Sequence, residues 1–347
     1  MADDKQASPF GGETGHGLAD KCSLCGGRLD HAAKETPRAS APLLLLQLLR
    51  ARYASIAARG TRRLLVVVAA ALVVLAAVLH FVFAESGVAD GRLSAGLNHT
   101  CWVKSNGTVT CWGDDFDGKA RPPKGSFLSI SAGHGHTCGV KTGGAVVCWG
   151  DNFTGKTAPQ GGSFSSVSAG GGHTCGVKTD GTVACWGDNL ASQATPPNGT
   201  FLSVSAGGGH TCGVKTDGAI ACWGDNTFGQ ATPPQGTFLA VSASIFHTCA
   251  VRTDRTLACW GSSSAGEART PEGKFASVSA GGGHTCGVKT DGTVACWGLD
   301  TDGESTPPTG SFSVVSAGGV HACGAKTDGT IVCWGDNTSG QATPPAM

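Results

Sequence analysis

Cysteine and histidine recur at fixed intervals over most of this 347-residue chain. Seven pairs of cysteines stand ten residues apart, and a histidine precedes the first cysteine of each pair by two residues. Opposed cysteines can form disulfides, thiolates and imidazoles can bind a metal, and a ring of imidazoles can sense pH. The elements that carry these residues decide among the three chemistries.

The chain repeats with a period of 37 residues. Six phenylalanines, from Phe127 to Phe312, keep this spacing. The recurring histidines keep it too: His99, His136, His173, His210, His247, His284 and His321. Such a period is typical of architectures in which each copy buries its faces against its neighbours. Seven copies fill residues 90–347.

Each copy has the pattern of a small antiparallel sheet. The segment FLSVSA (201–206) alternates as a strand does, HTCGVKT and GTVACWG flank a Thr-Asp-Gly turn, and GQATPP is typical of a short edge strand that ends at proline. We therefore predict four strands per copy. Seven such sheets, none able to bury both faces alone, predict an all-β, seven-bladed β-propeller.

The turn after Lys178 predicts which residues face each other. A three-residue loop with Gly181 in the left-handed conformation places Cys175 opposite Cys185, at a site where Cα atoms lie about 4.5 Å apart and a disulfide fits. The predicted pairs are Cys101 with Cys111, Cys138 with Cys148, Cys175 with Cys185, Cys212 with Cys222, Cys249 with Cys259, Cys286 with Cys296, and Cys323 with Cys333. Fourteen paired cysteines indicate an oxidising compartment.

The recurring histidines should stand at the start of the second strand, on one rim of the ring. No carboxylate recurs beside them, so we expect them to hold a loop to the neighbouring copy, with metal binding or pH sensing as the alternatives. The segments 114–118 and 300–304 resemble calcium loops but lack the remaining ligands, and no G-x-S-x-G or H-E-x-x-H motif occurs. The sequence predicts neither a catalytic site nor a cofactor in the repeats.

Residues 64–84 form an apolar run long enough to span a bilayer as one helix. Five arginines between positions 50 and 63 precede this run, and two acidic residues follow it. This asymmetry predicts a single-pass plasma-membrane protein with a cytoplasmic N-terminus and an extracellular or periplasmic propeller, joined by a linker at 85–89. We expect a retained signal anchor; cleavage after 82–84 or a buried core helix are the alternatives.

Residues 1–63 are predicted to form a mostly disordered cytoplasmic tail, with a helix at 41–53 lying either against the inner leaflet or against a partner. Cys22 and Cys25 make a C-x-x-C turn that resembles one knuckle of a zinc ribbon, and His31 is a candidate further ligand. A closed zinc site needs four ligands, so a reduced thiol pair without metal is the alternative.

Charge gives no reason to expect nucleic acid as a partner. The chain has 25 basic and 25 acidic residues. From residue 85 onward it has 15 basic and 19 acidic residues, which makes the repeats mildly acidic, with no charged patch visible in the sequence.

The copies resemble the repeats of the regulator of chromosome condensation family. The resemblance rests on motifs such as HTCGVKTDGTVACWGDN (173–189) and WGDNTFGQ (223–230), and it covers residues 90–347. It implies a seven-bladed propeller. The paired cysteines are more similar to extracellular relatives, such as plant crinkly-type receptor ectodomains and secreted bacterial propellers that bind proteins. The family's founding activity, nucleotide exchange on a nuclear GTPase, is not expected, because no loop insertion could act as an exchange wedge.

Chain direction places the AGGGH and WGDNxxGQ loops together on one rim, which we call the upper rim. The Thr-Asp-Gly turns and the proline-rich links then lie on the opposite, lower rim. In copies 1–5 the upper loops carry large apolar residues: Phe116, Phe153, Leu190, Phe228, Ile245 and Phe246. We hypothesise that these residues bind a protein or glycan ligand. The alternative is that each phenylalanine packs over its own loop.

The sequence therefore favours a membrane-anchored extracellular binding module that acts as a receptor or scaffold. The alternatives are an enzyme with an unrecognised site on the rim and, by family resemblance, a guanine-nucleotide exchange factor.

Overall fold

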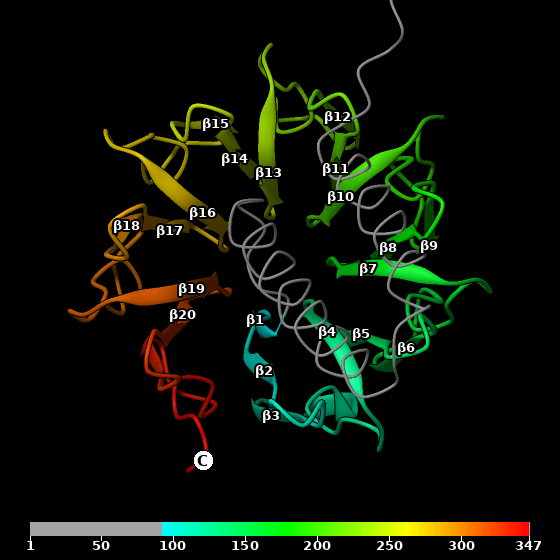
Figure 1. The fold of residues 1–347 in the computed structure, drawn as a ribbon, viewed down its shortest axis with the longest axis horizontal. Coiled ribbons are helices and arrows are strands. Elements are labelled where there is room, and N and C mark those ends of the chain that lie inside the picture. Colours follow the sequence, from blue (N-terminus) through cyan, green and yellow to red (C-terminus); the bar gives the residue numbers. More distant parts are fainter. Residues whose placement is uncertain (1–91, 347) are drawn as a thin grey trace, which may run out of the picture. The chain divides into compact units, whose positions relative to one another are not determined.

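The computed structural model describes residues 92–346. This part of the chain is all-β and consists of seven three-stranded antiparallel sheets, in which the strands follow one another in chain order. Figure 1 shows the sheets as blades around a common axis, with their first strands converging on it. The predicted seven-bladed propeller is confirmed.

The strands occur at equivalent positions in every blade. The first strands are β1 (Leu93–Ala95), β4 (Phe127–Ala132), β7 (Phe164–Ala169), β10 (Phe201–Ala206), β13 (Phe238–Ala243), β16 (Phe275–Ala280) and β19 (Phe312–Ala317). The second strands are β2 (His99–Val103), β5 (His136–Lys141), β8 (His173–Lys178), β11 (His210–Lys215), β14 (His247–Arg252), β17 (His284–Lys289) and β20 (His321–Lys326). The third strands are β3 (Val109–Gly113), β6 (Val146–Gly150), β9 (Val183–Gly187), β12 (Ile220–Gly224), β15 (Leu257–Gly261), β18 (Val294–Gly298) and β21 (Ile331–Gly335).

The hairpin between β8 and β9 has the predicted register. The amide of Lys178 donates to the carbonyl of Thr182 over 2.8 Å, and Gly181 has a φ of 84°, which a residue with a side chain rarely adopts. Cys175 therefore pairs with Cys185 across the hairpin.

All seven predicted disulfides are present, each between the second and third strand of one blade. The Cys175 and Cys185 Cα atoms lie 4.1 Å apart, close to the spacing expected for this kind of strand pair. In the loop-entropy account, each such bond stabilises the fold by roughly 2 to 3 kcal/mol.

The predicted fourth strand is wrong, because the proline-ended segment joins no sheet. In blade 3 the amide of Ala194 donates to the side chain of Asn189, and the amide of Thr195 donates to the carbonyl of Ser192. These two amides form hydrogen bonds within the loop, and the prolines that follow have no backbone N–H group. The segment therefore lacks the backbone donors that a fourth strand would need to pair with the sheet. The segment instead contacts the next blade, since the carbonyl of Gln193 accepts hydrogen bonds from Thr211 and Trp223.

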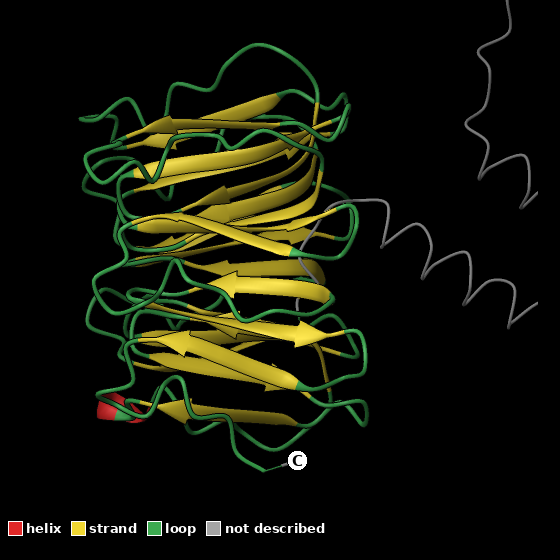
Figure 2. Cartoon of the chain, turned by 90° about the vertical axis from the view of Figure 1, so that its left-hand side faces the viewer, coloured by secondary structure: helices red, strands yellow, loops and turns green. Residues whose placement is uncertain are grey.

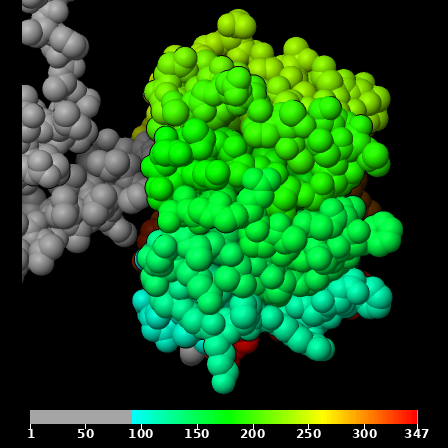
Figure 3. Space-filling model, turned by 90° about the vertical axis from the view of Figure 1, so that its right-hand side faces the viewer, coloured from blue at the N-terminus to red at the C-terminus, as the bar shows by residue number. Residues whose placement is uncertain are grey.

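The blades stack through two unlike faces. Cys138, Val140 and Val146 of blade 2 pack against Phe164 and Trp186 of blade 3. The two aromatic rings meet edge to face, with centroids 6.0 Å apart. Gly176 leaves room for the Phe164 ring, because a Cβ atom there would lie 2.7 Å from it; in blade 5 the equivalent residue is Ala250, which packs in one cluster with Phe238. Figure 3 shows the resulting wall, in which the blades coloured from cyan to yellow-green lie against one another.

Blade 7 closes the ring against blade 1 without exchanging a strand. The amide of Ala95 donates to the hydroxyl of Ser316 over 2.9 Å, and the indole of Trp112 donates to the carbonyl of Gln341 over 2.8 Å. The equivalent bonds join other neighbouring blades, as Ala132 to Ser94 and Trp149 to Lys119 show. Closure therefore uses the same contacts as every other interface.

The predicted tail (1–63), membrane span (64–84) and linker (85–89) lie outside the described residues, as do the candidate zinc ligands Cys22, Cys25 and His31. No helix within residues 92–346 has the length and apolar character needed to span a membrane.

Candidate ligand-binding rim

The two loops predicted for the upper rim do lie together. His136 at the start of β5 pairs with Gly150 at the end of β6, and the amide of Asp151 donates to the carbonyl of Gly135. In Figure 2 the short 3-10 helix Phe116–Gly118, coloured red, lies on this face. The chain enters on the lower rim, where the carbonyl of Arg92 accepts from the amide of Val103 at the end of β2.

Five of the six candidate rim residues are exposed to solvent. The exposed fractions are 73% for Phe116, 94% for Phe153, 96% for Leu190, 53% for Phe228 and 46% for Phe246. The alternative interpretation, in which each phenylalanine packs over its own loop, does not fit side chains with exposed fractions this large. Phe228 of blade 4 and Phe246 of blade 5 meet edge to face with ring centroids 5.2 Å apart, so the patch is continuous across that interface.

The loops that carry these side chains are held by their own polar residues. Oδ1 of Asp151 accepts from the amide of Phe153 over 2.8 Å, while Oδ2 accepts from the ammonium group of Lys156. In blade 4, Gln230 replaces the lysine and donates to Asp225 over 2.8 Å. The exposed apolar side chains therefore project from fixed loops.

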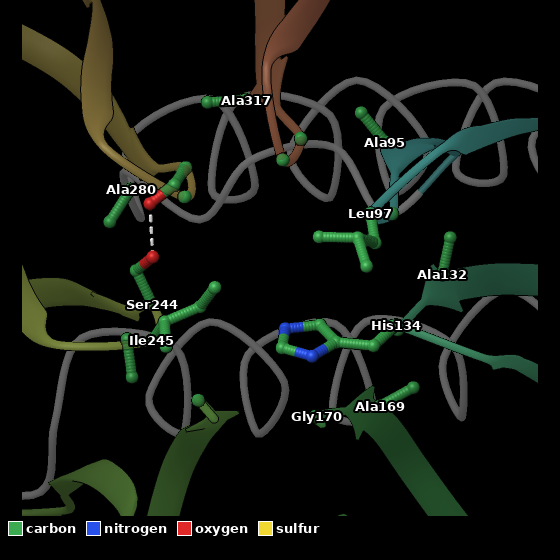
Figure 4. A pocket seen from close by; sticks show the side chains of 18 of the residues that line it. Ala95, Leu97, Ala132, His134, Ala169, Gly170, Ser244, Ile245, Ala280 and Ala317 are labelled. Atoms are coloured by element: carbon green, nitrogen blue, oxygen red, sulfur yellow. Dashed lines mark hydrogen bonds between the residues drawn. The ribbon is translucent and has the colours of Figure 1, made fainter. Parts of the chain in front are cut away.

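Ile245, the sixth candidate, is partly buried and belongs to a different feature. A cavity of about 90 Å³ lies on the axis, where the first strands end, and is lined mainly by alanine and glycine. Leu97, His134 and Ile245 replace glycines of the other copies and point into it (Figure 4). The sequence hypothesis placed Ile245 with the exposed rim; the structure separates it from the five exposed residues.

Sequence reasoning missed one apolar residue of the rim. Leu299 in blade 6 is exposed and stands where blades 1–4 and 7 have an aspartate. The departure of WGLDTDGE (297–304) from the common WGDN pattern marks this position in the sequence.

The recurring histidines hold the blades together, as expected. All seven are fully buried, and in six of the seven the Nε2 atom lies 2.7 to 2.8 Å from a threonine hydroxyl of the next blade. That hydroxyl in turn donates to a backbone carbonyl, as Thr211 does to Gln193 over 3.0 Å. His284 is the exception: its Nε2 has no partner, because the seventh copy has Ala322 in place of the threonine.

Burial keeps these imidazoles neutral. It lowers the pKa of His99 and His136 to about 3, and that of the other five to about 4, from an ordinary value of 6.5. These seven histidines therefore stay uncharged in the folded protein between pH 5 and 8. Within residues 92–346, no group of three or more histidine, cysteine or acidic side chains is placed to hold a metal.

Comparisons with known proteins agree with this architecture. The sequence model of the regulator of chromosome condensation (RCC1) repeat matches seven times, at residues 92–119, 127–156, 164–193, 201–230, 238–267, 275–304 and 312–341. A comparison with curated proteins gave no match.

Several solved structures are similar. The ectodomain of the Physcomitrella patens receptor kinase CR4 is 27% identical with a TM-score of 0.63, over 71% of this chain and 73% of that one. The CRINKLY WD40 ectodomain of the Arabidopsis thaliana receptor kinase ACR4 is 28% identical with a TM-score of 0.62, over 70% and 93%. Prp20p from Saccharomyces cerevisiae, at 16% identity and a TM-score of 0.56 over 65% and 80%, shares the fold. With seven repeat matches that fill the propeller, the chain belongs to the RCC1 repeat family.

Proposed function

We propose that this protein is a membrane-anchored extracellular binding module whose upper rim binds a protein or glycan ligand. The observation that carries the proposal is the set of exposed apolar side chains on that rim: Phe116, Phe153, Leu190, Phe228 and Phe246. Large apolar side chains gathered on fixed loops in water are typical of interaction surfaces.

The energetics of the rim favour binding over a structural role. Phe153 and Leu190 are almost fully exposed, so they add little to the stability of the fold. Burying such a side chain against a partner would contribute roughly 1.5 to 3 kcal/mol. Because hydrogen bonds such as that from the Phe153 amide to Asp151 already fix the loops, less conformational entropy is lost on binding.

Two observations support the extracellular location. Seven disulfides suit an oxidising compartment, and the similar plant structures are receptor ectodomains. The membrane anchor at 64–84 rests on the sequence alone.

The proposal is for a binding protein rather than an enzyme. Of the eight histidines in the propeller, seven are neutral and buried between blades. A general base or metal ligand must reach its substrate or ion, which these side chains cannot do while they are buried.

The proposal is tested by ligand capture. Cells that display the full chain would be probed with a panel of recombinant extracellular proteins and a glycan array. Changing Phe116, Phe153 and Phe228 to serine should abolish capture, with little change in Tm. The matched control changes Leu128 and Leu202 to serine, because these are exposed leucines near the lower rim. Unchanged capture in the rim variant, or equal loss in the control, would contradict the proposal.

A further inference from the structure

The fold separates charges that the sequence mixes. Seven of the lower-rim cations are the last residues of the second strands or their equivalents, such as Lys178, and most lower-rim acids lie in the turns that follow. The upper-rim acids lie mainly in the loops after the third strands, such as Asp188. No charged patch is visible in the sequence because the 37-residue repeat mixes these segments along the chain, whereas the fold sends them to opposite rims.

Counting by rim gives a net charge of −7 for the upper rim and +5 for the lower rim. The upper rim has Asp114, Asp115, Asp117, Asp151, Asp188, Asp225, Glu267, Asp300, Asp302, Glu304 and Asp336 against Lys119, Arg121, Lys156 and Arg269. The lower rim has Arg92, Lys104, Lys124, Lys141, Lys178, Lys215, Arg252, Arg255, Lys274, Lys289 and Lys326 against Asp180, Asp217, Asp254, Glu272, Asp291 and Asp328.

Within residues 92–346, the ion pairs of the upper rim lie in blades 1 and 2. Lys119 pairs with Asp114, Arg121 with Asp115, and Lys156 with Asp151. These pairs lie beside Phe116 and Phe153, so the aromatic side chains there stand in loops that are close to neutral.

Blade 6 is the most acidic part of the upper rim. Its loop has Asp300, Asp302 and the buried Glu304, and no basic residue. Both aspartates are exposed, and no ion pair to either is present within residues 92–346. The loop of Asp225 in blade 4 also has no basic residue, and Oδ2 of Asp225 accepts a hydrogen bond from the neutral side chain of Gln230.

The same sector holds apolar residues. Phe228 of blade 4 contacts Phe246 of blade 5, and Leu299 of blade 6 is exposed beside Asp300. Blades 4–6 therefore combine exposed aromatic and aliphatic side chains with carboxylates that have no cationic partner. Such a surface complements a segment that presents cations together with apolar groups, because apolar contact supplies affinity and opposite charge supplies steering and specificity.

We propose that the upper rim over blades 4–6 binds a basic protein segment in which lysine or arginine alternates with large apolar residues. The inference rests on the proposed function and deepens it by naming the chemistry of the partner. Basic side chains would approach Asp225, Asp300 and Asp302, while apolar ones would cover Phe246 and Leu299. The net charge of −7 on the whole rim would speed their encounter.

The repeats offer a substitution that removes charge without disturbing the loop. Four other blades have asparagine at the position of Asp300, and blade 7 has Ser339 at the position of Asp302. Asn337 of blade 7 accepts from the amide of Ala342, as Asp300 does from that of Ser305. The double variant Asp300→Asn, Asp302→Ser should therefore fold as the native chain does.

The lower rim offers the matched control. Asp217→Asn with Asp291→Asn removes two charges from the Thr-Asp-Gly turns, where blade 1 already has Asn106. Asn106 accepts from the amide of Thr108 over 3.0 Å, as Asp291 does from that of Thr293 over 2.9 Å. A third variant, Phe228→Ser with Phe246→Ser, removes apolar contacts but no charge.

The probe is an array of immobilised 15-residue peptides that vary independently in net charge and in content of large apolar residues. The full chain in detergent would be applied at 0.05 and 0.5 M NaCl. We expect it to select peptides that are both basic and apolar, and to bind them several-fold less at high salt. The blade 6 charge variant should bind about three- to tenfold less, in line with weak pairs on an exposed surface, and the lower-rim control should bind as the native chain does.

The outcomes separate the two proposals. One outcome would contradict the basic partner but agree with a binding rim. In that outcome the chain selects neutral or acidic peptides, the Phe228 and Phe246 variant no longer binds them, and the blade 6 charge variant still does. Equal loss of binding in the lower-rim control would also overturn the inference. Binding that neither upper-rim variant reduces would overturn both proposals.

Discussion

Acid should unfold the propeller in a pH range set by its seven buried histidines. Their pKa is about 3 to 4 in the folded chain and 6.5 when unfolded, so each contribution to stability is complete above pH 6.5 and is lost as pH falls through 6.5 toward 4. At pH 5.5 each histidine costs about 1.3 kcal/mol relative to pH 7.5, and the seven together cost about 9 kcal/mol. That sum is comparable to the whole stability of many domains.

The assay is thermal unfolding of the disulfide-bonded chain from pH 7.5 to 5.0. Even a third of the sum would lower Tm by about 6 to 12 °C at pH 5.5. Aspartates whose pKa is lowered by hydrogen bonds lose their contribution to stability at a lower pH than this range. The pKa of Asp225, for example, is lowered by hydrogen bonds from Thr227, so its contribution is lost only below about pH 4. Near pH 5, protonation of these histidines should make unfolding take up about six protons. A Tm that stays constant within about 2 °C would refute the reasoning.

Three further predictions concern the unpaired His284, the disulfide pairing and the membrane topology. Ala322→Thr should supply the hydroxyl that His284 lacks and stabilise the fold by about 1 kcal/mol, measured as a Tm higher by about 2 to 4 °C; an unchanged Tm would show that the interface is already satisfied. Peptide mapping without reduction should find Cys175 joined to Cys185, and links between blades would disprove the pairing. Protease added to intact cells should remove the repeats and spare a tag at residue 1, whereas the reverse pattern would invert the predicted topology.

The sequence predicted the fold well where the determinants lie within one copy. The position of Gly181 sets the hairpin, the hairpin opposes Cys175 to Cys185, and the 37-residue period repeats that geometry seven times. The fourth strand failed because its prediction weighed only local pattern. Competing partners decided the outcome: Asn189 binds the amide that a ladder would need, and the next blade binds the carbonyl of Gln193.

The site was less predictable, because its features depend on neighbours in different copies. The threonine that binds His173 lies 38 residues away, and Thr100, which binds His321, lies 221 residues away, so only the closed ring brings these partners together. Charge separation likewise follows from which rim each loop reaches. Ile245 was assigned to the exposed patch because its loop belongs to the upper rim, but the convergence of the first strands on the axis turns this position into the central cavity.

Blade 5 shows how the rim can depart from the repeat without weakening the ring. In most blades a backbone amide next to the axis donates to the following blade, as Gly171 does to the carbonyl of Gly207 over 3.0 Å. At blade 5, where Ser244 replaces glycine, the serine hydroxyl donates to the carbonyl of Gly281. The link between blades is kept while the following residues become Ile245 and Phe246. A side-chain donor thus replaces a backbone donor at the place where the rim gains an exposed aromatic ring, so variation on the rim is compatible with an intact scaffold.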